Sequence, residues 1–121
     1  MTGPTAAATV HPLCRLDELA DGHSRGFDPT GEGHDSMFIV RRGDALHAWR
    51  NACPHIDGAP MPWRKDAYLS GDRQQIVCYA HGARFEIESG LCVRGPCLGQ
   101  RLEAVALRVD DEGHVYLASP A

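Results

Sequence analysis

The sequence contains no long apolar run, no basic leader and no excess of positive charge. No segment approaches the roughly 18 apolar residues that a membrane-spanning helix needs. The N-terminal residues, MTGPTAAATVHPL, lack the basic region and the apolar stretch of a secretory signal peptide. A net charge of −4 and a pI near 5.9 argue against general nucleic-acid binding, which requires a basic surface. We therefore expect a cytoplasmic protein that contacts neither membranes nor nucleic acid.

Helical periodicity is also scarce, and strand signals take its place. LDELADG, at residues 16–22, is long enough for one helical turn at most. The segments 37–42 and 45–52 flank Gly43-Asp44, a pair typical of a two-residue hairpin turn. These features predict a first antiparallel hairpin near the middle of the chain.

Further short strands follow. Residues 75–78 and 84–88 have strand character. Near the C-terminus, apolar residues alternate within 105–109 and 115–117, on either side of DDEG, which indicates a hairpin with one buried face. Several short strands at close spacing predict an all-β fold, a small antiparallel sandwich or barrel.

The length of 121 residues suits one compact domain. We expect residues 1–9 to form a flexible tail and residues 10–121 to form the domain. An apolar content of 43% is enough for a packed core without disulfides. Five cysteines is an odd number, which favours metal binding over a disulfide framework in a reducing compartment.

Two short motifs combine cysteine with histidine. CPHIDGAP begins at Cys53 and supplies His55, whereas CYAHGARF begins at Cys78 and supplies His81. The two motifs fall in loops at strand ends, where side chains from separate segments can converge. Two thiolates and two imidazoles are a ligand set typical of a metal centre.

Two metal centres use this ligand set. One is a structural zinc site, which usually takes both cysteines from one segment and both histidines from another. The other is a [2Fe–2S] cluster in which two histidines hold one iron and two cysteines hold the other. Here each loop supplies one of each, and Gly58 and Gly82 allow the backbone to pass close to bridging sulfides. The spacing favours the cluster and leaves zinc as the alternative.

Residues 53–90, from CPH to CYAHGARFEIESG, resemble the signature of Rieske ferredoxins. The shared elements are a C-x-H loop, a C-x-x-H-G loop and a following F-[DE]-x-x-[ST]-G strand and turn. The resemblance implies the small β-barrel-like Rieske fold, with a cluster-binding subdomain at about residues 50–98 formed by the two loops. Gly95-Pro96 resembles the proline-containing third loop that covers the cluster in that family.

The resemblance also implies a cofactor, a ligand set and a function. One [2Fe–2S] cluster would be bound per chain, with Cys53 and Cys78 on the inner iron and His55 and His81 on the outer iron. The expected function is one-electron transfer, without catalysis, from a flavin-dependent reductase to a terminal ring-hydroxylating oxygenase. The alternatives are a small Rieske subunit of a larger oxidoreductase and, less favoured, a structural zinc domain. We do not expect an oxygenase, because no residues remain for a mononuclear iron domain.

The environment of such a cluster also has expected properties. Ala83 stands where high-potential relatives carry serine, and Phe85 stands where they carry an aromatic hydroxyl. Without these donors the reduced cluster is less stabilised, so we expect a potential near the low end of the Rieske range, roughly −150 mV. Tyr79 is the remaining hydroxyl in the motif. The first loop is one residue longer than the common form.

Several residues outside the proposed ligand set also have expected roles. Cys92 and Cys97 are expected to be thiols in a reducing cytosol, although their spacing also suggests a regulatory disulfide. Cys14 and Trp49 are expected to pack in the core. No metal role is expected for the isolated histidines, His11, His23, His34, His47 and His114. Four basic residues in or beside the motifs form either a scatter of solvated charges or a basic collar that steers an acidic partner: Arg64, Lys65, Arg84 and Arg94.

Overall fold

The computed structural model describes residues 12–52, 61–62, 65–79 and 82–118. Within these ranges the chain forms three small antiparallel sheets of three strands each. The central sheet has the order β2-β3-β4, with β2 at Ser24–Phe27, β3 at Met37–Arg42 and β4 at Ala45–Arg50. The all-β prediction is therefore confirmed.

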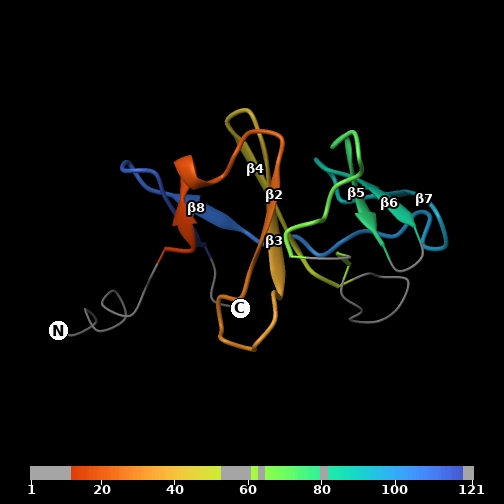
Figure 1. Cartoon of the computed structure of the whole chain (residues 1–121), viewed down its shortest axis with the longest axis horizontal. Coiled ribbons are helices and arrows are strands. Elements are labelled where there is room, and N and C mark those ends of the chain that lie inside the picture. The colour runs from red at the N-terminus through yellow and green to blue at the C-terminus, as the bar shows by residue number, and fades with distance from the viewer. Residues whose placement is uncertain (1–11, 53–60, 63–64, 80–81, 119–121) are drawn as a thin grey trace.

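The other two sheets lie on either side of the central one (Figure 1). One has the order β5-β6-β7, with β5 at Gln75–Cys78, β6 at Ala83–Glu86 and β7 at Cys92–Arg94. The other has the order β1-β9-β8, with β1 at Cys14–Arg15, β8 at Leu107–Val109 and β9 at His114–Leu117. The single helical turn in the described ranges is a 3₁₀ helix at Leu16–Glu18, inside the predicted range.

Strand β3 separates two hydrophobic cores. Phe38 and Val40 point into the first core, toward the β5-β6-β7 sheet, whereas Met37 and Ile39 point into the second core, toward β1-β9-β8. Since side chains alternate across a strand, an unbroken apolar run is what a strand buried on both faces requires. The sequence MFIV meets this requirement.

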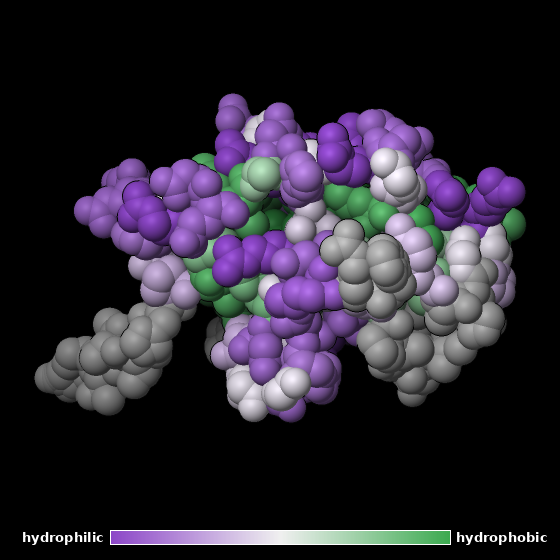
Figure 2. Space-filling view, viewed as in Figure 1, coloured by the Kyte–Doolittle hydropathy of each residue, from purple (hydrophilic) through white to green (hydrophobic). Residues whose placement is uncertain are grey.

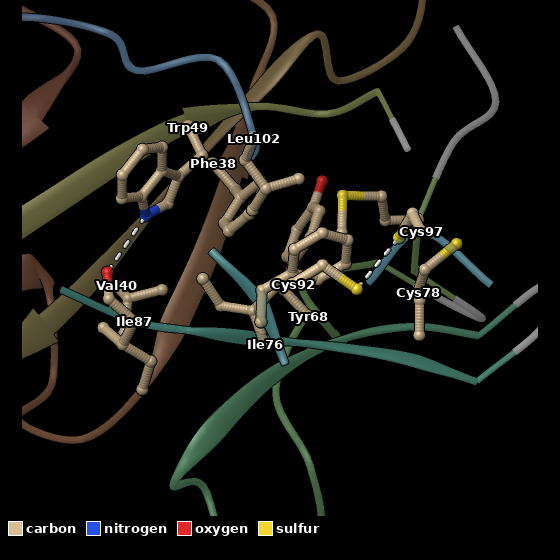
Figure 3. Packing of buried hydrophobic residues seen from close by; sticks show 13 residues of the cluster. Phe38, Val40, Trp49, Tyr68, Ile76, Cys78, Ile87, Cys92, Cys97 and Leu102 are labelled. Carbon is tan, nitrogen blue, oxygen red and sulfur yellow. Dashed lines mark hydrogen bonds between the residues drawn. The ribbon is translucent and has the colours of Figure 1, made fainter. Parts of the chain in front are cut away.

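The first core holds most of the large buried side chains (Figure 3). The rings of Phe38 and Tyr68 stack with centroids 4.1 Å apart, which joins β3 to the segment before β5. Trp49 is buried, and its Nε1 donates a hydrogen bond of 3.3 Å to the Ile87 carbonyl. The prediction that Trp49 packs in the core is confirmed. Cys14 is buried in the second core, also as predicted.

The segment after β7 connects the first core to the central sheet. Leu91 pairs with Arg101, and Trp49 pairs with Ala104, as isolated bridges. The Arg50 amide also donates to the Glu103 carbonyl at 2.9 Å. The two sheets around the first core are therefore linked by backbone hydrogen bonds as well as by side-chain packing.

The predicted strands are found with small shifts. Segments 37–42 and 75–78 match β3 and β5, and β4 ends two residues earlier than predicted. The segment 84–88 corresponds to β6, and the C-terminal hairpin to β8 and β9. The predictions missed β2 and β7, because SRGF and CVR are short and carry no alternation strong enough to identify a strand.

In Figure 2 the visible surface is mostly hydrophilic, and hydrophobic side chains show mainly between polar ones. No described helix is long and apolar enough to cross a membrane.

Candidate metal centre

Cys78 is the predicted ligand that the structure describes. It ends β5, is fully buried and pairs with Ala83, the first residue of β6. The amide of Gly82 donates to the Cys78 carbonyl at 2.8 Å, and Gly82 has a φ of 77°, which favours glycine. Cys78 and Ala83 thus pair across the end of the β5–β6 hairpin, with the cysteine fixed at the end of a strand.

The other three predicted ligands, Cys53, His55 and His81, lie outside the described residues. The described residues on either side of the first motif nevertheless show where that motif enters and leaves the fold. Asn51 follows β4, and its Oδ1 accepts a hydrogen bond of 2.8 Å from the amide of Met61. Asn51 Nδ2 in turn donates to the Asp35 carbonyl at 2.8 Å. Two described residues that flank the first motif, Asn51 and Met61, are therefore linked by one side chain.

Met61 also contacts the second motif through its backbone. Its side chain is fully buried in the first core, and its carbonyl accepts a hydrogen bond of 2.8 Å from the amide of Tyr79. Tyr79 directly follows Cys78. Met61, which directly follows the first motif, is thus hydrogen-bonded to the residue beside the described cysteine.

The predicted third loop lies against the second motif. Gly95 approaches the backbone of Ala83 so closely that a Cβ at position 95 would be 2.8 Å from the Ala83 Cα. Cys97, two residues further on, is fully buried in the same core as Cys78. Three segments far apart in sequence therefore meet around the end of the β5–β6 hairpin.

The side chains near Cys78 supply few hydroxyl donors. Ala83 and Phe85 are fully buried and have no hydroxyl, as noted from the sequence. The Tyr79 hydroxyl donates a hydrogen bond to the Leu69 carbonyl at 2.5 Å. Ala83 and Phe85 therefore supply no hydroxyl to the hairpin that carries Cys78, and the low potential within the Rieske range stays a prediction.

The four basic residues of the predicted collar differ in their surroundings. Arg64 lies outside the described residues. Lys65 Nζ is 2.7 Å from Asp35 Oδ2 and 3.5 Å from Asp66 Oδ1. The hydrogen bond from Lys65 to Asp35 raises the pKa of the lysine. Lys65 is therefore part of an internal ion pair, which makes it a poor candidate for the steering of a partner.

Arg84 is also engaged within the protein, since its Nη1 donates to Gln75 Oε1 at 3.1 Å across the β5–β6 pair. Arg94, at the end of β7, is exposed and adjoins the third loop. Of the described members of the predicted collar, Arg94 is the one whose position suits contact with a partner.

Sequence reasoning did not find the polar contacts that hold the Lys65–Tyr68 segment against β2. The Gly26 amide donates to Asp66 Oδ1 at 2.7 Å, and Ser24 Oγ donates to the Asp66 carbonyl at 2.7 Å. These partners are about 40 residues apart in sequence, and no local pattern identifies them. They fix the approach of the chain to the hairpin that carries Cys78.

One group of three potential ligands lies elsewhere in the described part of the chain. Asp110, Glu112 and His114 have ligand atoms within 4.8 Å of one another in the β8–β9 turn. The Asp110 carboxylate accepts the amides of Glu112 and His114, both at 2.9 Å. These hydrogen bonds make the Asp110 carboxylate a cap of the β8–β9 turn.

The described residues fit a cluster held by loops at one end of the fold. The full burial of Cys78 suits the inner, thiolate-bound iron of a mixed-ligand [2Fe–2S] centre. The glycine turn at Gly82 and the close approach of Gly95 leave backbone, and not bulky side chains, around the hairpin end.

Comparisons with known proteins agree with this geometry. A family model described as the Rieske [2Fe–2S] domain matches residues 9–115. The ferredoxin of carbazole 1,9a-dioxygenase from Nocardioides aromaticivorans IC177 is 28% identical, with a TM-score of 0.68, over 91% of this chain and 97% of that one. A search of curated proteins gave no match.

Two further solved structures share the fold. A Sphingomonas yanoikuyae B1 ferredoxin is 20% identical, with a TM-score of 0.68, over 93% of this chain and 100% of that chain. A chain in a complex of reduced oxygenase and oxidised ferredoxin in carbazole 1,9a-dioxygenase is 23% identical, with a TM-score of 0.68, over 89% of this chain and 91% of that one. The chain belongs to the family of Rieske [2Fe–2S] domains, and it is a ferredoxin-type electron carrier and not a catalyst.

Proposed function

We propose that this protein carries single electrons from a flavin-dependent reductase to a terminal ring-hydroxylating oxygenase in the cytoplasm. The observation that carries the proposal is the hydrogen bond between Tyr79, beside buried Cys78, and Met61, at the end of the first motif. It supports the convergence of both motifs on one centre. The match to a ferredoxin over 97% of that protein's length supports a carrier in preference to a domain of a catalytic subunit.

We assign Cys53 and Cys78 to the inner iron and His55 and His81 to the outer iron. The cluster, when bound, supplies a site that accepts and releases one electron. The protein then has to exclude water from the thiolate-bound side, and the full burial of Cys78 and Ala83 supports this role. Imidazole ligands are neutral, so they make the addition of an electron less costly than in an all-cysteine cluster.

The partners follow from the relatives. One matched structure is a complex of an oxygenase with a ferredoxin, and we propose a terminal oxygenase as the electron acceptor of this chain also. A flavin-dependent reductase is the proposed donor, because single-electron carriers of this type need a partner that divides the electron pair of a nicotinamide. The position of Arg94 next to the third loop suits a transient contact with an acidic face.

Ligand variants test the assignment. Cys78→Ser should lose the visible absorption of the cluster and all electron transfer from a reductase to an oxygenase. Cys14→Ser is the matched control, because Cys14 is equally a buried cysteine but lies in the second core. Normal cluster content in the Cys78 variant, or equal loss in both variants, would contradict the assignment.

A reconstituted system tests the partners. Electron flow should require the reductase, this protein and the oxygenase together, and should stop when any one is left out. Co-purification with a larger oxidoreductase, combined with no transfer to any isolated oxygenase, would favour the subunit alternative instead.

A further inference from the structure

Cys92 and Cys97 form a buried pair of thiols beneath the third loop. Their Sγ atoms are 3.1 Å apart and hydrogen-bonded, and the residues are 1% and 0% exposed. Figure 3 shows the two side chains pointing toward each other, at the end of the first core where Cys78 also lies. The structure shows a proximity of the two sulfurs that the sequence alone does not give.

The backbone holds this pair in place. The Cys92 amide donates to the Gln100 carbonyl at 2.7 Å, and the Gly99 amide donates to the Cys92 carbonyl at 3.0 Å. The Gln100 amide donates to the Cys97 carbonyl at 2.9 Å, which closes the turn around Cys97. Because a disulfide bond is about 2.05 Å long, the sulfurs need to approach by only about 1 Å.

The loop also offers a route for an oxidant. From Val93 to Gln100, Cys97 is the one buried residue, whereas all its neighbours in that range are exposed. Leu98, directly beside it, is 67% exposed. A local opening of this loop therefore brings Cys97 to solvent while the strands around both cores stay folded, and such openings are the least costly motions in a folded protein.

We propose that Cys92 and Cys97 are a reversible redox pair, oxidised to a disulfide by low-molecular-weight disulfides such as oxidised glutathione. One cysteine thiolate attacks the glutathione disulfide, which forms a mixed disulfide and releases one glutathione thiol. The second cysteine thiolate then attacks the protein sulfur of that mixed disulfide and releases the other glutathione. Two protein thiols are oxidised, and one glutathione disulfide is reduced to two thiols.

The disulfide would fix the third loop in its present position. Gly95 and Pro96 lie between the two cysteines, and Gly95 packs on Ala83 at the start of β6. A covalent link from Cys92 to Cys97 removes the local opening described above. The pair would thus adjust the mobility of the loop beside the metal centre according to the thiol–disulfide balance of the cell.

Peptide mapping of the cluster-loaded protein tests this proposal. The protein is incubated with oxidised glutathione, quenched with acid, alkylated and digested with trypsin. Cleavage after Arg94 separates the two cysteines into the peptides FEIESGLCVR and GPCLGQR. We expect these peptides to be recovered as a disulfide-linked pair, to separate again after treatment with dithiothreitol, and to leave Cys14 alkylated.

Linkage of either cysteine to Cys78, stable mixed disulfides with glutathione, or full alkylation of both thiols would each overturn the proposal. The variant Cys14→Ala should retain the linked pair, whereas Cys97→Ala should lose it. Deuterium exchange at residues 93–100 should slow on oxidation of the wild-type protein, and unchanged exchange would contradict the effect on the loop. The mapping does not depend on electron transfer, so it can fail while the proposed function stands.

Discussion

Gly95 packs against the backbone of Ala83 so tightly that any side chain at position 95 would collide with it. A Cβ would be 2.8 Å from the Ala83 Cα, and the φ of Gly95 is 103°, a value that side-chain-bearing residues rarely adopt. This contact places the third loop against the hairpin that carries Cys78. It makes glycine necessary at this position for two separate reasons.

Gly95→Ala should therefore destabilise the protein by about 1–3 kcal/mol and reduce retention of the cluster. Gly99→Ala is the matched control, since Gly99 has a φ of 87° but a Cβ at that position would meet nothing within 4 Å. Thermal unfolding of the two loaded variants should show the larger loss at Gly95. Equal losses would mean that backbone conformation alone matters and that the contact with Ala83 does not.

The midpoint potential of the cluster should respond to a hydroxyl group at position 83 but not to the hydroxyl group at position 79. Ala83→Ser introduces a donor where high-potential relatives carry serine, so the midpoint potential should rise. Tyr79→Phe should leave the potential nearly unchanged, because the Tyr79 hydroxyl donates its hydrogen bond to the Leu69 carbonyl. Protein-film voltammetry of both variants makes the comparison, and a large fall in potential in the Tyr79 variant would contradict this account.

Steering of a partner should depend on Arg94 and not on Lys65. Arg94→Glu should slow electron transfer several-fold at low ionic strength, with the effect fading as salt screens the charges. Lys65→Gln should leave the salt dependence of electron transfer unaltered. It should lower the free energy of unfolding by at most about 1 kcal/mol, because the ion pair that it removes, between Lys65 and Asp35, is partly exposed to solvent. Arg108→Glu, an exposed charge on β8, is the control for net charge.

The electron-transfer rates of these variants also decide whether the basic residues beside the motifs form a collar that steers a partner or a scatter of solvated charges. If Arg94→Glu and Arg108→Glu, which change the net charge by the same amount, slow transfer equally, net charge is responsible and no local contact at Arg94 is needed. If none does, the basic residues beside the motifs are solvated charges without a steering role.

Asp110 should make stability dependent on acid pH. The hydrogen bond from the His114 amide lowers the pKa of Asp110 in the folded protein. A lowered pKa means that the folded state favours the carboxylate, so the stabilisation is complete above the unfolded pKa of about 4 and is lost as pH falls through the folded pKa. The stability difference between wild type and Asp110→Asn, measured by urea unfolding, should be constant near neutral pH and shrink below about pH 4. A difference that grows on acidification would show the opposite linkage.

The β3–β4 and β5–β6 hairpins could be predicted from the sequence because their signals are local. Gly43-Asp44 identifies the β3–β4 turn, and the spacing of Cys78 and Gly82 identifies the β5–β6 loop. The contacts between distant segments beside the two motifs could not be predicted. Asn51 binds the amide of Met61, and Lys65 pairs with Asp35, through single polar side chains between distant segments. Such pairs leave no periodic pattern in a sequence.

The proximity of Cys92 and Cys97 also could not be predicted from the sequence. The spacing of five residues permits either facing or diverging side chains. The hydrogen bonds from the Cys92 amide to the Gln100 carbonyl and from the Gly99 amide to the Cys92 carbonyl fix the backbone on which the two sulfurs face each other.

The most direct test of the central claim is a reductive titration of the purified protein followed by electron paramagnetic resonance, together with iron and sulfide analysis. The account predicts red-brown protein with one [2Fe–2S] cluster per chain, one unpaired electron per chain on reduction and a midpoint potential near the low end of the Rieske range, roughly −150 mV. Colourless protein that contains zinc and no inorganic sulfide would contradict the account.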